Sequence, residues 1–302
     1  MSFASLDWGE MINLFYCTDA NFGDAMSPMV VAKLGGQEVR PSSMWNADMM
    51  AIGSVFYRGD YFMRDWEHKG IGNRLKCMAW AVNQLMARPI VVWGSGFLQY
   101  PLFKRPCCNR KLDIRAVRGK YTRKILEGYG LISSDEKVAY GDPGLLFADL
   151  FGIKANPKYD VGIIPHKYDV DRGWLNRLGE AFRVAGVDIK LINVADEPLK
   201  VVSQIAECSK VISSSLHGLV VADSLGIPNL HMTISTLGHS LRDYELKFQD
   251  YYSAYGRSMP QMIDAEALII SAREYIKDKA FSVSDKKIIC EVKEALKDCF
   301  PR

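Results

Sequence analysis

The sequence predicts an α/β fold of two domains, and three observations support this. Short apolar runs alternate with amphipathic stretches, which is the pattern of βαβ units with a parallel sheet. The pattern is interrupted at FGIKANPKYD (151–160), where Gly, Pro and Asn accumulate without periodicity, and it then restarts. A length of 302 residues suits two domains of ordinary size. We therefore expect an N-terminal domain over 1–155 and a C-terminal domain over 156–302.

The first half is expected to be a series of buried strands joined by helices. The predicted strands are 11–17, 49–56, 89–97, 113–119 and 137–142, and the predicted helices include 24–36, 73–87 and 120–129. The first of these helices stops at Gly35 and Gly36, because glycine favours the left-handed conformation that ends a helix.

The second half repeats the series and ends in helices. The predicted strands are 161–165, 188–194, 210–215 and 228–232, and the predicted helices are 172–186, 198–208 and 217–225. The chain is mostly helical from 261 onward, and a terminal helix over 284–300 has Ile288, Val292 and Leu296 on one stripe. Two Rossmann-like halves facing each other across a cleft are the simplest architecture. Such clefts bind ligands outside the carboxyl ends of the strands.

Composition and charge exclude several classes of protein. A net charge of +3 is too small for a nucleic-acid binder, and no apolar run approaches the roughly 18 residues of a membrane span. The start, MSFASLDWGEM, lacks the basic and apolar regions of a secretory signal. Seven cysteines without a C-x-x-C pair suit neither a disulfide framework nor a zinc site, and the five histidines include no H-x-x-x-H pair. We therefore expect a cytoplasmic protein that needs no metal.

The stretch SSSLHGLVVADSLGIP (213–228) places polar residues where a strand becomes a helix. These residues are Ser213, Ser214, Ser215, His217 and Gly218. If the helix begins near Leu216, its first backbone N–H groups favour an anion, and the hydroxyls add donors. A lone histidine is more often structural, but one beside a helix start and three hydroxyls is more typical of a site. We predict a phosphate site with a titratable group beside it.

Three other corners carry weaker signals. In NFGDAMSP, Asp24 is either the N-cap of a helix or, with Asn21 and Gly23, part of the cleft. In VWGSGF, Gly94 and Ser95 let a ligand approach the backbone closely, although the spacing is not that of a dinucleotide site. In YGDPGLLF, an Asp-Pro pair is typical of an N-cap followed by proline, so a structural role is the better interpretation.

Arg118 and His166 occupy matching places in the two halves. Arg118 closes an apolar strand and is followed by glycine, so a fixed guanidinium there could form a fork with a carboxylate or phosphate. His166 stands at the mouth of the first strand of the second half. We expect Arg118 and His217 to be partly buried, at opposing strand ends.

The segment 103–124 holds nine basic residues and one acidic residue. Two interpretations stay open. The charges could form a solvated face with Arg115 and Arg118 alone facing the cleft. They could also form a peripheral contact with an anionic membrane, with Phe97, Tyr100 and Phe103 at the level of the headgroups.

Seven motifs in chain order resemble the polysaccharide pyruvyl transferase family. They are NFGD, GSG, AVRGKYTRKILEGYG, VAYGDPGLLF, VGIIPHKYDVD, SSSLHGLVVADSLGIPNL and KFQDYYSAYG, spread over residues 11–256. Members are similar in fold to GT-B glycosyltransferases. The resemblance implies transfer of an enolpyruvyl unit from phosphoenolpyruvate to a sugar, with a pyruvate ketal as the usual product.

The resemblance also implies roles for matching positions. Arg118 would hold phosphoenolpyruvate, the 213–218 corner would bind its phosphate or carboxylate, and His217 would act as acid or anion ligand. Asp24 would be the base for the acceptor hydroxyl. Many members have Arg two residues before the histidine, where this chain has Ser215. The candidates to replace that cation are His166, Lys247 and Arg242.

The expected partners follow from the same chemistry. Phosphoenolpyruvate is a co-substrate, and no redox cofactor is needed. The implied acceptor is a glycan on a lipid-diphosphate carrier at the inner face of the membrane. Two alternatives stay open. A GT-B glycosyltransferase would need a carboxylate for the ribose of its nucleotide sugar, and Asp223 or Glu245 could serve only loosely. A non-catalytic sugar-binding protein of polysaccharide assembly would keep the fold without the Arg118–His217 pair.

Overall fold

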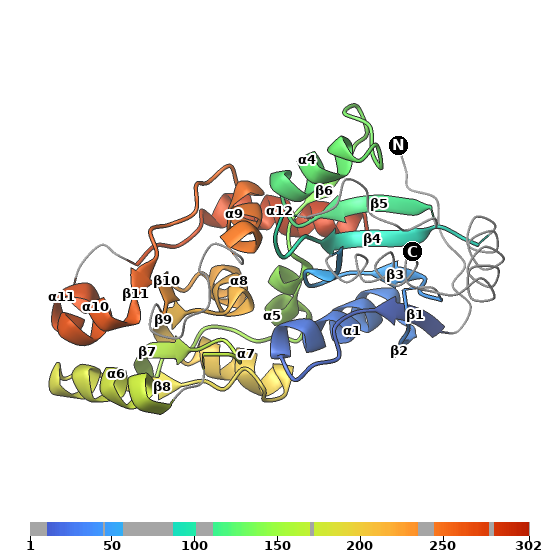
Figure 1. The fold of residues 1–302 in the computed structure, drawn as a ribbon. Coiled ribbons are helices and arrows are strands. Elements are labelled where there is room, and N and C mark those ends of the chain that lie inside the picture. The colour runs from blue at the N-terminus through green and yellow to red at the C-terminus, as the bar shows by residue number, and fades with distance from the viewer. Residues whose placement is uncertain are drawn as a thin grey trace, which may run out of the picture.

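Two α/β units make up the protein, each built on a parallel sheet (Figure 1). This computed structural model describes residues 11–44, 46–56, 87–100, 111–169, 172–234, 245–277 and 281–301. The predicted α/β class with two Rossmann-like units is confirmed. The predicted helix over 73–87 lies almost wholly outside the described residues.

The first sheet has the strand order β2-β1-β3-β4-β5-β6, and all neighbouring pairs are parallel. Its strands are β1 (Met11–Phe15), β2 (Glu38–Pro41), β3 (Met49–Met50), β4 (Ile90–Ser95), β5 (Leu112–Val117) and β6 (Ala139–Tyr140). The sequence does not predict β2. This edge strand is mostly exposed and therefore has no apolar run.

The second sheet has the order β11-β10-β9-β7-β8, again all parallel. Its strands are β7 (Tyr159–Ile164), β8 (Ile189–Leu191), β9 (Cys208–Ser213), β10 (Asn229–Thr233) and β11 (Ile263–Asp264). Only the two-residue strand β11 has no counterpart in the sequence prediction, because so short a strand shows no period.

Both sheets follow the same doubly wound order. Numbered within its own unit, each sheet contains the run 2-1-3-4-5. The direction of winding reverses between β1 and β3 in the first unit and between β7 and β9 in the second. Ligands of doubly wound folds bind at such switch points, outside the carboxyl ends of the strands. The topology therefore marks one edge of each sheet for a site.

The connecting helices cover the sheets and also join the two units. They are α1 (Phe22–Gly35), α4 (Lys120–Gly128), the 3-10 helix η2 (Pro143–Leu146), α5 (Phe147–Leu150), α6 (Arg172–Val184), α7 (Pro198–Ala206), α8 (Leu216–Leu225), α9 (Glu245–Ser253), α10 (Ala265–Ile270), α11 (Ala272–Lys277) and α12 (Lys286–Asp298). One apolar core is continuous through both units and includes Met26 of α1, Val220 of α8 and Leu296 of α12. No helix of the described residues is both long enough and apolar enough to cross a membrane.

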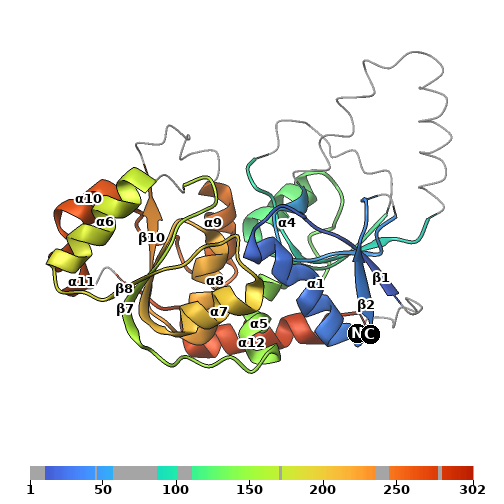
Figure 2. The ribbon, with the colours of Figure 1, turned by 90° about the horizontal axis from the view of Figure 1, so that it is seen from below.

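The terminal helix α12 runs along one side of both units (Figure 2). Trp93 of β4 donates its Nε1–H to the carbonyl of Leu296 at 2.9 Å. Lys293 reaches Asp149 of α5 at 2.9 Å. The buried stripe of α12 includes Ile289, whereas the predicted Ile288 is 36% exposed. The predicted stripe was therefore wrong by one residue at its start.

The two helices that open at the switch points begin in different ways. Helix α1 has Asn21 as its N-cap, which accepts the N–H of Gly23 at 3.1 Å. The N-cap interpretation of Asp24 is therefore wrong, and Asp24 lies in the first turn instead. Helix α8 begins at Leu216, as predicted, and Ser215 provides no side-chain cap among the described residues.

Candidate functional site

The carboxyl ends of the strands at the two switch points face each other. Phe22 of α1 donates its N–H to the carbonyl of Val194, beyond β8, at 2.7 Å. Lys167, beyond β7, pairs with Asp19, beyond β1, at 3.2 Å between Nζ and Oδ2. Both contacts join segments that belong to different units. The region between these segments is where the sequence places its candidate site.

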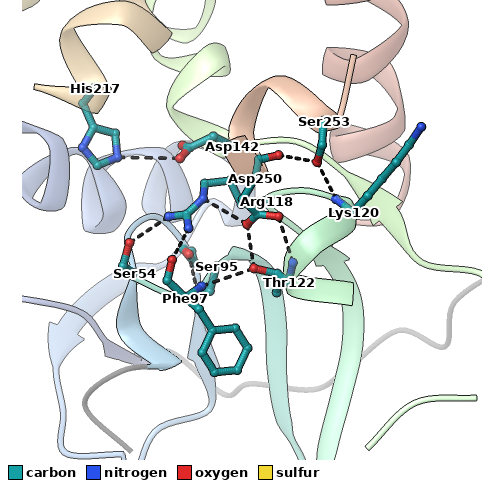
Figure 3. Close-up of polar contacts among 11 residues, drawn as sticks. Ser54, Ser95, Phe97, Arg118, Lys120, Thr122, Asp142, His217, Asp250 and Ser253 are labelled. Atoms are coloured by element: carbon teal, nitrogen blue, oxygen red, sulfur yellow. Dashed lines mark hydrogen bonds and ion pairs between the residues drawn. The ribbon is translucent and has the colours of Figure 1, made fainter. Parts of the chain in front are cut away.

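His217 lies in the first turn of α8 and is 7% exposed. Its Nε2 lies 3.7 Å from Oδ2 of Asp142, the residue that precedes η2 (Figure 3). The opposite side of the ring lies against α1, because a Cβ added to Gly23 would be only 1.9 Å from Nδ1. Gly23 is therefore needed for the close approach of the two helix starts.

Asp24 follows directly and is half-buried beside the loop after β3. A Cβ on Gly53, whose φ is +110°, would lie 2.8 Å from Asp24 Oδ1. Two of the three predicted catalytic residues, His217 and Asp24, are thus brought together at the start of α1.

Arg118, at the end of β5, is completely buried (Figure 3). Its Nε pairs with Oδ2 of Asp250 at 3.2 Å and its Nη1 donates to Ser54 Oγ at 2.8 Å. Its Nη2 donates to the carbonyl of Phe97. The expected partial burial of Arg118 is therefore wrong. The strand end is covered by α9, which comes from a distant part of the sequence.

Asp250 also connects α9 to the start of α4 through hydrogen bonds. Its Oδ1 accepts the N–H of Thr122 at 2.8 Å, and its Oδ2 accepts the Thr122 hydroxyl at 2.6 Å. Next to it, Ser253 accepts the N–H of Lys120 at 2.8 Å. A Cβ on Gly119 would lie 1.8 Å from the carbonyl oxygen of Asp250. The glycine after Arg118 thus serves the docking of α9.

Lys247 lies on α9, three residues before Asp250, and is half-buried. Burial, together with the positive charge of Arg118, lowers the pKa of Lys247 to about 8. Asp24 and Asp169 act in the opposite direction. The charges of Arg118 and Asp24 thus both act on Lys247.

The serine corner uses most of its hydroxyls within the protein. Ser213 Oγ accepts the N–H of Ser215 at 3.0 Å and contacts the carbonyls of Ile164 and Ser215. Ser214 Oγ accepts the N–H of His166 at 2.8 Å and donates to Asp169 Oδ2 at 2.5 Å. These bonds join the ends of β7 and β9. They occupy the hydroxyls of Ser213 and Ser214 and leave the first-turn N–H groups of α8 as donors for an anion.

Three further candidates lie in packed positions. A Cβ on Gly94 would be 2.2 Å from the Pro143 ring, and one on Gly218 would be 2.4 Å from Ser213 Oγ. Ser95 is completely buried and donates to the carbonyl of Ala51. The structure gives these residues packing roles, and their contact with a ligand stays a prediction.

The basic segment is only partly described. Arg115 is buried and paired with Asp113 at 2.9 Å, so it does not form a basic face. Phe97 is buried and stacks on Phe56 with 4.9 Å between ring centroids, so its prediction as a membrane-facing residue is wrong. Tyr100 is exposed. Phe103, Lys104, Arg105, Arg110 and Arg242 lie outside the described residues.

Asp223, an alternative ribose ligand, is buried at the end of α8. It accepts hydrogen bonds from Asn229 at 2.8 Å, Tyr251 at 2.9 Å and the Ser284 hydroxyl at 3.0 Å. Burial raises the pKa of Asp223. All of these donors belong to the protein, so Asp223 joins several elements of the fold through its hydrogen bonds. These contacts leave Asp223 poorly suited to bind a ribose, and Asp223 was one of the two candidates for that role.

The sequence does not identify Asp169 or Asp250 as members of the site. Asp250 stands in KFQDYYSAYG and Asp169 in VGIIPHKYDVD, two of the motifs quoted above. The only signal was their place within these motifs. Among the described residues, no group of three or more His, Cys, Asp or Glu side chains could hold a metal ion.

Comparison with known proteins gives several similarities. An uncharacterized protein of Acanthamoeba polyphaga mimivirus is 36% identical over 148 residues, 48% of each chain. The succinoglycan biosynthesis protein ExoV of Rhizobium meliloti (strain 1021) is 27% identical over 192 residues, 61% of this chain and 54% of that protein. The matches thus span about half the length of these curated relatives. The spinosyn rhamnosyltransferase SpnG, complexed with spinosyn aglycone, has a TM-score of 0.43 at 14% identity, over 95% of this chain and 96% of its own.

A family model, described as polysaccharide pyruvyl transferase, matches residues 42–236, more than half of the chain. The match includes Arg118, Asp142 and His217, and Asp24 and Lys247 lie outside it. Of these residues, His217 and Asp142 lie 3.7 Å apart, and Arg118 donates to Ser54, beyond β3. The chain belongs to the polysaccharide pyruvyl transferase family.

Proposed function

We propose that the protein transfers the pyruvyl unit of phosphoenolpyruvate to two hydroxyls of a glycan, forming a cyclic ketal and releasing phosphate. The observation that supports this most is the Lys247 ammonium, whose pKa is lowered by burial and by the charge of Arg118 and is raised by Asp24 and Asp169. The donor has a carboxylate and a phosphate and needs at least two positions rich in positive charge or N–H groups. Lys247 offers one of them, and the first turn of α8 offers the other.

The proposed reaction balances as a substitution at C2 of phosphoenolpyruvate. His217 gives a proton to the CH2 carbon, which becomes a methyl group and leaves an oxocarbenium-like centre at C2. One sugar hydroxyl attacks C2 as Asp24 takes its proton. The C2–O bond to phosphate breaks, and phosphate leaves with the electron pair. A neighbouring hydroxyl attacks C2 to close the ketal, and its proton leaves with phosphate.

Lys247 also accounts for a difference from the family at Ser215. Many members carry an arginine at that position. We assign Lys247 as the replacement because it is half-buried and is acted on by the charge of Arg118. Arg118, completely buried and bound to Asp250, then acts by holding α9 in place and by adding positive charge nearby. Its direct contact with phosphoenolpyruvate stays a prediction.

The proposed acceptor is a glycan on a lipid-diphosphate carrier at the inner face of the membrane. Succinoglycan biosynthesis, in the name of the R. meliloti relative, supports a glycan acceptor. The proposed membrane contact is peripheral, through the basic residues of 103–124 other than the buried Arg115 and Arg118. Binding to anionic vesicles should fall with ionic strength and when Lys104, Arg105, Arg110 and Lys111 are changed to serine. Vesicle binding that is unchanged by ionic strength and by the four substitutions would refute this contact.

The test of the activity is phosphate release from phosphoenolpyruvate with a panel of lipid-linked and nitrophenyl sugars. Thermal shifts are measured in parallel with phosphoenolpyruvate and with uridine nucleotides. We expect release with at least one sugar and stabilisation by phosphoenolpyruvate alone. Stabilisation by a uridine nucleotide alone would favour the glycosyltransferase instead. Stabilisation by neither, without phosphate release, would favour a binding protein.

A further inference from the structure

We propose that Asp142 is a positioning residue for His217. Its Oδ2 accepts the Nε2–H of the imidazole and so leaves Nδ1 as the nitrogen that exchanges a proton with substrate. This inference deepens the proposed function and rests on it for the role of His217. The sequence alone favours a purely structural role for Asp142, as the cap of η2.

The cap accounts for only one of the two carboxylate oxygens. Oδ1 of Asp142 accepts the N–H of Gly144 at 2.9 Å. Oδ2 is buried and has no hydrogen-bond partner among the described residues. A buried carboxylate oxygen without a donor is costly, and an asparagine or serine would cap the helix as well. Oδ2 therefore needs an explanation beyond the cap.

The imidazole of His217 likewise has one buried nitrogen without a hydrogen bond among the described residues. That nitrogen is Nε2, which lies 3.7 Å from Oδ2 of Asp142. A hydrogen bond needs a separation up to about 3.2 Å, so the pair has to close by about 0.5 Å. Hydrogen bonds at catalytic groups are often long without substrate and tighten in the complex.

Both members of the pair are held firmly enough to act on each other. Asp142 precedes Pro143, whose ring fills the space where Gly94 would carry a Cβ. The His217 ring lies against Gly23 on its Nδ1 side, at the start of the helix that carries Asp24. Nε2 thus faces Asp142, and the Nδ1 edge of the ring lies against the first turn of α1, one residue before Asp24.

Asp142→Asn isolates the proposed role. The asparagine Oδ1 keeps the cap, while an amide N–H now faces Nε2 and requires that nitrogen to be unprotonated. The matched control is Asp285→Asn at the N-cap of α12, where the aspartate accepts the N–H groups of Lys287 and Ile288. Asp142→Ser is a second variant that can keep the cap and places no amide beside Nε2.

The first readout is the ¹⁵N spectrum of the histidine side chains, with the His217 signal assigned by its loss in His217→Gln. We expect a proton on Nε2 in the unmodified protein and in Asp285→Asn. In Asp142→Asn the neutral ring should carry its proton on Nδ1. Nε2 protonated equally in the unmodified protein and in Asp142→Asn would overturn the inference, whether or not the protein uses phosphoenolpyruvate.

The second readout is steady-state kinetics. We expect kcat to fall about 100-fold or more in Asp142→Asn, because an amide does not stabilise the imidazolium that donates its proton from Nδ1, with KM for phosphoenolpyruvate within about threefold. The kcat of Asp142→Ser should also fall, and the kcat of Asp285→Asn should equal that of the unmodified protein. Unchanged kcat in Asp142→Asn would contradict the inference. Failure of the unmodified protein to release phosphate would instead refute the proposed function, and the spectrum would still decide the pairing.

Discussion

Arg118 and Asp250 form an ion pair, at 3.2 Å between Nε and Oδ2, that is buried on both sides and joins the end of β5 to α9. The two residues are 132 positions apart in the chain. Lys247 lies three residues before Asp250 on the same helix, so the pair also fixes where the ammonium group stands. Stability and the proposed function should therefore depend on the same contact.

Breaking this pair should destabilise the protein. We expect Asp250→Ala to lower the free energy of unfolding by about 3–5 kcal/mol, because it leaves the buried Arg118 charge without a partner. Arg118→Ala should likewise be destabilised rather than merely inactive. Urea denaturation measures the loss. The control is Glu180→Ala, which removes an exposed pair with Arg183 and should change little. A loss in Asp250→Ala no larger than the control would contradict the structural role.

The contrast between prediction and structure is clearest at this pair. The apolar run that ends at Arg118 predicted both β5 and the place of the arginine at the sheet edge. Burial was missed because Asp250 belongs to α9, and no local pattern shows which helix covers a strand end. Phe97 was misjudged for the same reason. Its neighbours predict a strand, but only the tertiary structure places its ring against Phe56.

Gly23 should be needed for activity through His217. In Gly23→Ala the new Cβ would lie 1.9 Å from Nδ1, so the imidazole has to move. We expect turnover to fall at least about tenfold, since small displacements of a catalytic group are costly. Gly128→Ala at the end of α4 is the matched control. Its Cβ meets no described atom within 4 Å, so it should be neutral or stabilising by up to about 1 kcal/mol. Normal turnover in Gly23→Ala would show that the ring position is not critical.

His217 itself should be essential for turnover. We expect His217→Ala to stay folded and to lose more than about nine tenths of the rate, a loss above about 1.4 kcal/mol in activation free energy. Circular dichroism checks folding, and phosphate release measures turnover. A folded variant that keeps over a tenth of the rate would remove His217 from the mechanism.

Chelation should leave the activity intact. The scattered histidines of the sequence offer no ligand spacing, and the proposed reaction uses Lys247 and helix N–H groups to bind the anion. Phosphate release after dialysis against EDTA should equal that of the untreated protein. Activity that is lost on dialysis and restored by an added divalent ion would overturn this expectation.

The site was predicted more completely in the second unit than in the first. The strand-to-helix change at Ser213–His217 is visible in the sequence because an apolar run ends in four polar positions. What the serines do is not visible there, since Ser214 bonds to Asp169 and His166 across 45 and 48 positions. Asp24 was placed in the wrong helix position, because aspartate and asparagine both favour N-caps and Asn21 took that place.

Lys247 should give the activity an alkaline limit. Because its pKa is lowered to about 8, the side chain is charged below that pH and loses its proton as the pH rises through it. The charged form binds the anionic donor, so kcat/KM for phosphoenolpyruvate should decline above about pH 8. Lys247→Arg should remove this decline, since a guanidinium stays charged over the whole range. Lys247→Met should raise KM about 10- to 100-fold at every pH, whereas Lys190→Met, on the outer strand β8, should not. A decline that persists unchanged in Lys247→Arg would assign the alkaline limit to another group.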